Sequence, residues 1–547
     1  LVMDDVVLHN CASYPIEASI LNYAVMGYVN AYDCPNRVLA IWDTNLYSSY
    51  TLPNTNIPYY LKYTLTWGNN AVFTLEPGVS LRFGEHGKMF FAGGASLIAN
   101  GTQALPISFL AVGDNHWKGF NFAANASGSF DHCVINDSGY PEYGYPEPVI
   151  EGSGFSSLSI SNSNIWGGTT YGLYITGSNE GALNLNNVEI ANCPWTGLYI
   201  NNSSLNLEYD NLSITNCGRP IEMPANLVDF LDQQPVFTDN GSNSIFLINN
   251  GYMYRDTTFR NWGYPYICES IDLTANWINL VFQPGVVVQL GYSLGISCNG
   301  TVTAIGTETQ PITFTRLPSS TQNWRGFILN SGITNAHFNH CLLEHCGSSN
   351  QYNHIQNAIT FYNADTVLIE NTQITDVYCR AIFIESNNND ADNLTLSNVT
   401  ISGCGMDAVY QNSSGCQLSI NGLAVSNCSA FPLSISGNWV HQLSNITLTS
   451  NAKNVIRIVN GGYLASQTLA NHGYPYWVSG YPLYVNYTTV NLEPGTVFYF
   501  ESSLSLEVYG TLNALGTADN PIVFTRPPDA TYYWQGIIFR NNSNGDL

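Results

Sequence analysis

The chain is poor in charged side chains, since Asp, Glu, Lys and Arg make up only 10% of its 547 residues. Lys and Arg total 15 against 39 acidic residues, which gives a net charge of −24 at pH 7. An acidic surface without a basic stripe repels phosphate backbones and anionic lipid headgroups. We therefore expect no nucleic-acid partner.

Long apolar runs and helix signals are also missing. No stretch approaches the ~18 apolar residues of a membrane-spanning helix, so no membrane insertion is expected in this piece. No window combines a sustained helical stripe with helix caps. The first residues, Leu1-Val2-Met3-Asp4-Asp5, have the pattern of mid-strand sequence and not that of a signal peptide.

Apolar residues, asparagine and glycine are plentiful instead. Hydrophobic residues make up 45% of the chain, and it contains 65 Asn and 47 Gly. Asn and Gly tolerate left-handed backbone angles, which tight turns require. The composition therefore favours strands joined by tight turns.

A long repeat runs through the chain. The segment from Leu492-Glu493-Pro494-Gly495 to Trp534 has earlier copies that begin around Pro77 and Pro284, at intervals of 207 and 210 residues. Such an array predicts the end of a truncated unit at 1–55, units at 56–261 and 262–471, and the start of a third at 472–547. Because both ends fall inside a unit, we expect a piece of a longer polypeptide.

A shorter repeat of 24 residues lies inside each unit. Asn187–Cys193 is followed by Asn211–Cys217, and Asn398–Cys404 by Gly422–Cys428. Apolar and polar residues alternate over four to six positions before each turn, the period of a β-strand. This pattern predicts an all-β fold, a right-handed parallel β-helix with coils of about 24 residues, in preference to a sandwich or propeller. The stacked corners would form a side-chain ladder of Asn187, Asn211, Asn371 and Asn398.

Motifs within the long repeat resemble the right-handed parallel β-helix proteins of the pectin-lyase-like superfamily, and particularly their non-enzymatic bacterial cell-surface members. The motifs are Gly510–Thr517, Pro521–Thr525 and Trp534–Phe539, with a second copy at Gly300–Thr307 and Pro311–Thr315. The resemblance implies the fold, whereas the function stays open because this fold hosts both lyases and inert stalks.

Catalytic residues of the enzyme branch are not found, and we expect no enzyme. Glu85-His86-Gly87 and Asn471-His472-Gly473 match the Gly-His-Gly motif of polygalacturonase-like members only in half, and Val459 follows Arg457-Ile458 where their Arg-Ile-Lys motif requires Lys. Asp131 and His132 would suit acid–base work, as would Asp114 and His116. However, the repeat changes Asp131-His132-Cys133 to Asn339-His340-Cys341, so the acid is lost in the copy.

One loop is a candidate for a cation. Asp390 and Asp392 lie in an insertion that lengthens the coil between Ile374 and Ile401 from 24 to 27 residues. Carboxylate and amide oxygens are calcium ligands. A solvated loop is the stronger interpretation, so no cofactor is expected other than calcium at these two residues.

The cysteines follow the short repeat. Stacked coils would place Cys193 over Cys217 and Cys404 over Cys428, close enough for disulfides in distance. A ladder of small buried thiols is the alternative, and we favour it.

Aromatic turns and sequons complete the list of candidates. Tyr-Pro steps such as Tyr264-Pro265 and Tyr474-Pro475 predict packed turns, with a sugar-stacking platform as the alternative. The chain has 15 Asn-X-Ser/Thr sites, only slightly more than chance gives, which permit glycosylation. They include Asn211, Asn393, Asn398, Asn445 and Asn486.

These features together predict an extracellular structural protein, a rod-like part of a surface fibre, filament, sheath or adhesive stalk. Its expected partners are copies of itself or neighbouring surface proteins, and polysaccharide. The alternative is a carbohydrate-active enzyme or binding module that uses one face of the β-helix.

Overall fold

The structure, a computed structural model, describes the chain except for residues 1, 24, 114–115, 124, 141–146, 349–355, 387–391, 461, 465, 542 and 547. Backbone contacts divide it into two compact units. Unit 1 comprises residues 1–250 and 264–266, and unit 2 comprises residues 251–263 and 267–547. The boundaries of the long repeat units stay a prediction, since they describe sequence phase and not compactness.

The fold is an all-β parallel solenoid of about 21 turns of roughly 24 residues, which confirms the predicted fold class. Helix accounts for 3% of the chain. The helices of the described part are three 3-10 turns, η1 (Ile20–Tyr23), η2 (Ala225–Phe230) and η3 (Gly437–Gln442). None of the helices seen in the described residues has the length and apolarity needed to cross a membrane.

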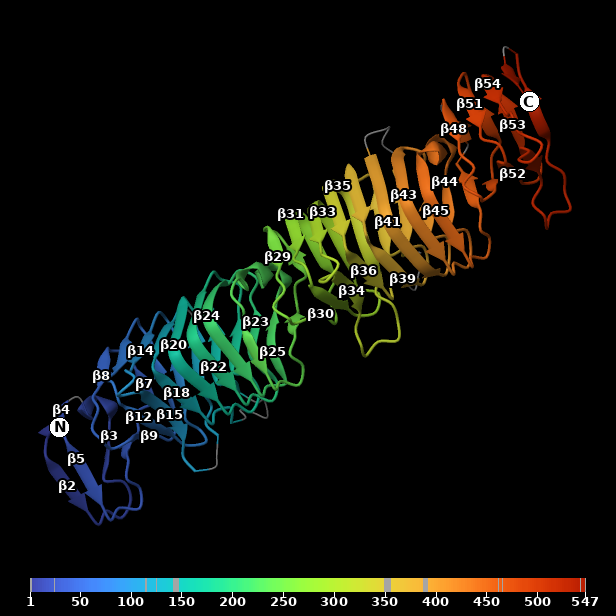
Figure 1. The fold of residues 1–547 in the computed structure, drawn as a ribbon. Coiled ribbons are helices and arrows are strands. Elements are labelled where there is room, and N and C mark those ends of the chain that lie inside the picture. Colours follow the sequence, from blue (N-terminus) through green and yellow to red (C-terminus); the bar gives the residue numbers. More distant parts are fainter. Residues whose placement is uncertain are drawn as a thin grey trace. The chain divides into compact units, whose positions relative to one another are not determined.

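The coils of unit 1 contribute strands to three parallel faces (Figure 1). The first face is formed by β7 (Asn45–Leu46), β10 (Thr64–Trp67), β13 (Lys88–Phe91), β16 (Phe120–Ala123), β19 (Ile150–Ser153), β21 (Leu173–Thr176), β23 (Thr196–Asn201), β25 (Arg219–Met223) and β27 (Ile245–Leu247). The second begins with β8 (Tyr50–Leu52), β11 (Val72–Leu75), β14 (Ser96–Asn100) and β17 (Ser127–Asp131), and the third contains β3 (Ile16–Ala18), β6 (Leu39–Ile41), β9 (Tyr59–Leu61), β12 (Ser80–Phe83), β15 (Ile107–Ala111), β18 (Cys133–Asn136) and β26 (Val236–Thr238). The long strands β20 (Ser157–Trp166), β22 (Ala182–Ala191) and β24 (Asn206–Thr215) run through both the second and the third face.

The core of each coil is filled by apolar side chains that stack in register. Ile165, Ile190 and Ile214 follow one another on successive coils, and all three are fully buried. This arrangement follows from the period of two, which points alternate residues of a strand inward. The inward residues of one coil therefore rest on those of the next.

Unit 2 repeats this pattern of faces. Its first face includes β37 (Ile359–Tyr362), β40 (Ile382–Glu385), β42 (Val409–Gln411), β44 (Leu433–Ser436), β46 (Ile456–Val459), β49 (Tyr476–Val478), β52 (Val497–Phe500) and β55 (Val523–Thr525). Three long strands, β31 (Leu273–Phe282), β33 (Gly295–Ile305) and β35 (Gly326–Asn339), begin in the first face and continue into the second. The other two faces are formed further along by β38 (Thr366–Glu370), β39 (Gln373–Val377), β41 (Asp392–Cys404), β43 (Cys416–Ser426) and β45 (Leu443–Thr449). The last coils add the sheets of β47 (Gly462–Leu464), β50 (Leu483–Val485), β53 (Ser505–Val508) and β56 (Gly536–Phe539), and of β48 (Gln467–Leu469), β51 (Thr489–Leu492), β54 (Thr511–Asn513) and β57 (Asn544–Asp546).

Individual hydrogen bonds also recur at equivalent positions of the long repeat. In unit 1 the Asn54 side chain donates to the Pro77 carbonyl at 3.0 Å, and in unit 2 Asn471 donates to the Pro494 carbonyl at 3.2 Å. The Tyr264 hydroxyl accepts from the backbone N–H of Phe237 at 3.0 Å. Tyr474 repeats this contact with Leu448 at 2.9 Å in unit 2. The hydroxyls of these two Tyr-Pro tyrosines therefore hydrogen-bond to the backbone of an earlier strand.

Candidate functional site

The strongest positional signal of the sequence, the asparagine at each coil corner, marks a left-handed backbone position. Asn162, Asn187 and Asn211 have φ of 48°, 54° and 50°, and Asn371 and Asn398 have 45° and 53°. Most L-residues are disfavoured there, whereas Asn tolerates the conformation because its short amide bonds locally. The long strands β20, β22 and β24 turn from one face to the next at this residue.

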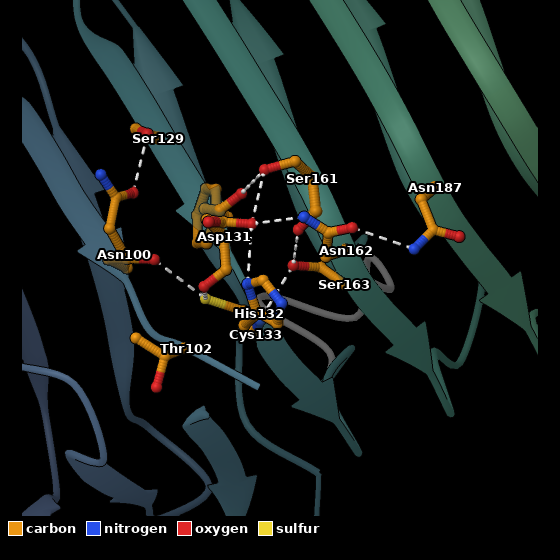
Figure 2. Close-up of polar contacts among 12 residues, drawn as sticks. Asn100, Thr102, Ser129, Asp131, His132, Cys133, Ser161, Asn162, Ser163 and Asn187 are labelled. Atoms are coloured by element: carbon orange, nitrogen blue, oxygen red, sulfur yellow. Dashed lines mark hydrogen bonds and ion pairs between the residues drawn. The ribbon is translucent and has the colours of Figure 1, made fainter. Parts of the chain in front are cut away.

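The corner amides of unit 1 form a hydrogen-bonded row, which we call the corner ladder (Figure 2). The Nδ2 of Asn211 donates to Oδ1 of Asn187 at 2.7 Å, and Asn187 donates to Asn162 at 3.0 Å. Asn162 donates in turn to Oδ1 of Asp131 at 2.8 Å. Every amide therefore points its N–H the same way, and the row ends on a carboxylate.

The same row of amides occurs in unit 2, but the carboxylate that ends it comes from a different coil. Asn398 donates to Asn371 at 3.3 Å, and Asn371 donates to Asn339 at 3.0 Å. Asn339 then donates to Glu370 at 3.4 Å, and the His337 ring lies 2.9 Å from the same carboxylate oxygen. The carboxylate lost at Asn339 is thus replaced by Glu370 on the next coil.

Asp131 and His132 contact each other, since Nδ1 of His132 lies 3.0 Å from Oδ1 of Asp131. Burial alone would raise the pKa of Asp131, but contacts with Asn162, Ser161 and His132 outweigh it and lower the pKa. The adjacent Cys133 points into the core, where burial raises the pKa of its thiol to about 12. A thiol so hard to ionise is a poor nucleophile. In the structure, Asp131 is the acceptor at the end of the corner ladder.

Asp392, one of the two calcium candidates, is fully buried at the start of β41. Its Oδ2 accepts a hydrogen bond from the Ser386 hydroxyl, while Oδ1 has no partner among the described residues. Burial raises its pKa, and the charge of Asp365 adds to that rise. Asp390 lies outside the described residues. No group of three or more acidic, His or Cys side chains suited to a metal occurs in the part of the chain that the structure describes, so calcium here stays a prediction.

All 13 cysteines carry free thiols in the structure, and all but Cys11 are buried. Cys193 lies one coil before Cys217, and Cys404 one coil before Cys428. Within each pair the interaction of the two thiols raises the pKa of the first, Cys193 or Cys404, and lowers the pKa of the second, Cys217 or Cys428. Cys133 and Cys341 differ, because each donates to a backbone carbonyl, of Ala99 at 3.1 Å and of Ala304 at 3.2 Å.

A polar cluster on the outer side of the first face in unit 1 was not predicted by any sequence motif. Lys88 Nζ lies 3.0 Å from Oε2 of Glu147, and the Asn121 amide bonds to Glu151. Burial raises the pKa of Glu151, and Glu147 adds to the rise while Lys88 opposes it. The only sequence signal is the position of Glu151 as an outward residue of a short strand, since its partners come from distant coils.

An aromatic pair follows this cluster along the same outward column. Tyr174 and Tyr199 stack with ring centroids 4.8 Å apart, and Trp195 beside them is 49% exposed. In unit 2, Phe383 and Tyr410 stack on the corresponding strands at 6.0 Å. The rings within each pair face each other along the coil axis, so they offer mainly edges to solvent.

The sequons fall into two groups. The Nδ2 atoms of Asn211 and Asn398 are engaged in the corner ladder, and Nδ2 of Asn445 donates to Asn421 at 2.7 Å. Asn393 and Asn486 have no side-chain hydrogen bond to any described residue, and glycosylation at all five sites stays a prediction. Comparison of the chain with protein families, curated proteins and solved structures finds no match.

Proposed function

We propose that this chain is a structural repeat protein, an extracellular segment of a surface fibre, filament, sheath or stalk. It would be related to the non-enzymatic right-handed β-helix proteins of the pectin-lyase-like superfamily. Its partners would be copies of itself or neighbouring surface proteins. Repetition in such a protein lengthens a surface without changing the way each coil is held.

One observation carries this proposal, namely that contacts holding coils together recur between units. The Asn240 side chain bonds the backbone N–H of Cys217 at 2.8 Å and the carbonyl of Ile214 at 2.9 Å. Asn451 makes the equivalent bonds to Cys428 and Val425, at 3.0 Å each. Selection for coils that stack on one another accounts for the recurrence of these hydrogen bonds.

The outward-facing residues of the first face also support a structural role, because they differ between the two units. Glu151 and Glu222 flank the tyrosine pair in unit 1, whereas Thr360 and Ser434 flank the aromatic pair in unit 2. The ionisable groups of this column are therefore not kept from one unit to the next. A set of catalytic groups that belonged to every repeat would be kept.

Polysaccharide binding is the second candidate, and the exposed Trp195 beside the first of two recurring aromatic pairs favours it. Tyr174 with Tyr199, and Phe383 with Tyr410, occupy corresponding positions of the two units. Rings in carbohydrate sites provide apolar faces for sugars, and Trp195 is the most exposed ring beside the first pair.

Incubation of the purified chain with acidic and neutral polysaccharides tests both candidates. A structural protein leaves the polymer length unchanged and binds none of the polymers. Binding that is lost in W195A would support the second candidate, and depolymerisation that is lost in E151Q would overturn the assignment as a non-enzyme.

A further inference from the structure

Six of the 13 cysteines lie in three pairs at one type of coil corner. Every member directly follows a residue in the left-handed conformation, and the two members of a pair are 23 or 24 residues apart. The pairs are Cys11 with Cys34, Cys193 with Cys217, and Cys404 with Cys428. Recurrence at the same place in three coil groups indicates a common role.

The coil geometry brings the thiols of a pair together. Parallel neighbouring strands lie about 4.8 Å apart, within the Cα separation that a disulfide tolerates. Cys404 and Cys428 lie in register on adjacent coils, since Ser402 pairs with Ser426 two residues before them. Asn451 anchors the backbone N–H of Cys428 at 3.0 Å, which holds that corner in place.

A small reagent can approach the pair in unit 2. An open pocket of about 630 Å³ is lined by Cys404, by Asn427 next to Cys428, and by Ser429 on its other side. Cys379 and Met406 line the same pocket. The pocket therefore reaches Cys404 and both sequence neighbours of Cys428.

We propose that Cys404 and Cys428 form a redox-active dithiol, which closes a disulfide between adjacent coils by exchange with a small-molecule disulfide. The Cys428 thiolate attacks one sulfur of the reagent, forms a mixed disulfide and releases one thiolate. Cys404 loses its proton and attacks the Cys428 sulfur, which releases the second thiolate. The cysteines lose two electrons and two protons, and the reagent is reduced to two thiols.

The assignment of roles follows from the asymmetry of the pair. The hydrogen bond from Cys404 lowers the pKa of Cys428. The same contact, together with burial, raises the pKa of Cys404. Cys428 is thus the thiol that ionises first and attacks, while Cys404 is the one that resolves. The Cys193–Cys217 pair has the same asymmetry and the same place in unit 1, and we extend the proposal to it.

Treatment of the reduced, folded chain with oxidised glutathione at neutral pH, followed by peptide mapping without reduction, tests the proposal. Peptides joined through Cys404 and Cys428 are expected to appear first. Cys133 and Cys341 serve as internal controls, because burial raises both thiol pKa values to about 12 and neither has a partner thiol in the described structure. Both should remain reduced.

Two variants separate the roles, with circular dichroism confirming that each is folded. C404S is expected to accumulate a glutathione adduct on Cys428, and C428S is expected to leave Cys404 reduced. An adduct on Cys404 in C428S would reverse the assigned roles. Free thiols at both positions in wild type, after Cys133 has reacted, would overturn the proposal.

Discussion

Asn211 donates a hydrogen bond through its side chain to Asn187, the residue 24 positions earlier, at 2.7 Å. Both residues have left-handed backbone angles, so one residue type meets two requirements of the corner. Asn turns the chain without the backbone strain that most other residues would have there, and its side-chain amide bonds to the corner of the preceding coil. Position 422 shows the limit of this rule, because Gly422 turns the chain there and Asn445 bonds to Asn421 instead.

Replacement of Asn187 separates these two contributions. N187A should lower the free energy of unfolding by about 1–2 kcal/mol, because it loses the ladder bonds and places Ala in a left-handed conformation. N187G should cost less, since Gly loses only the bonds and tolerates the angle. Thermal melts of both variants, followed by circular dichroism, check this order, and equal losses would contradict it.

The ladder of unit 1 should weaken in acid. The folded-state pKa of Asp131 is lowered, so its contribution to stability is present above its unfolded pKa of about 3.9 and is lost as pH falls through the folded value. D131N should therefore destabilise the chain at neutral pH, and its difference from wild type should vanish in strong acid. D210N, which changes an exposed carboxylate of β24, is the matched control and should have no effect.

Asp392 should behave in the opposite way. Its folded-state pKa is raised, so the stabilisation is complete below about pH 3.9 and is lost as pH rises through the folded value. D392N, which keeps an acceptor for Ser386, should melt at a higher temperature than wild type at neutral pH. Calcium that raises the wild-type melting temperature but not that of D392N would support the predicted cation site. A D392N chain that melts lower than wild type without calcium would contradict the burial argument.

Glu151 offers a test of the polar cluster on the first face. Because burial raises its folded-state pKa, the ionised form is disfavoured and stability is lost as pH rises through the folded value. E151Q should gain stability relative to wild type as pH rises, while keeping a hydrogen-bond acceptor for Asn121. Melting temperatures from acidic to neutral pH measure this difference, and a constant offset would show that ionisation is not its source.

The corners and the core could be predicted from sequence because their spacing is regular. Asn187, Asn211, Cys193 and Cys217 occur at fixed offsets, since the left-handed corner accepts few residue types and the buried site after it suits a small thiol. The ladder bonds follow once coils of 24 residues are stacked in register.

The polar cluster of Lys88, Glu147 and Glu151 could not be predicted, because the coils that carry it are irregular. Phe90 pairs with Asn121 after 31 residues, and Asn121 with Glu151 after 30. Lys88 and Glu147 are 59 residues apart. Loops of varying length set these intervals, so no regular spacing in the sequence predicts which outward side chains are in contact. The role of Glu370 as the acceptor in unit 2 could not be predicted either, because this carboxylate lies on a different coil from the Asn339 that replaces Asp131.

Electron microscopy of the native material, with antibodies raised against the purified chain, tests the proposed function most directly. A structural repeat protein predicts continuous filaments or sheath layers that are labelled along their length. Isolated short particles that shorten acidic polysaccharides would contradict it.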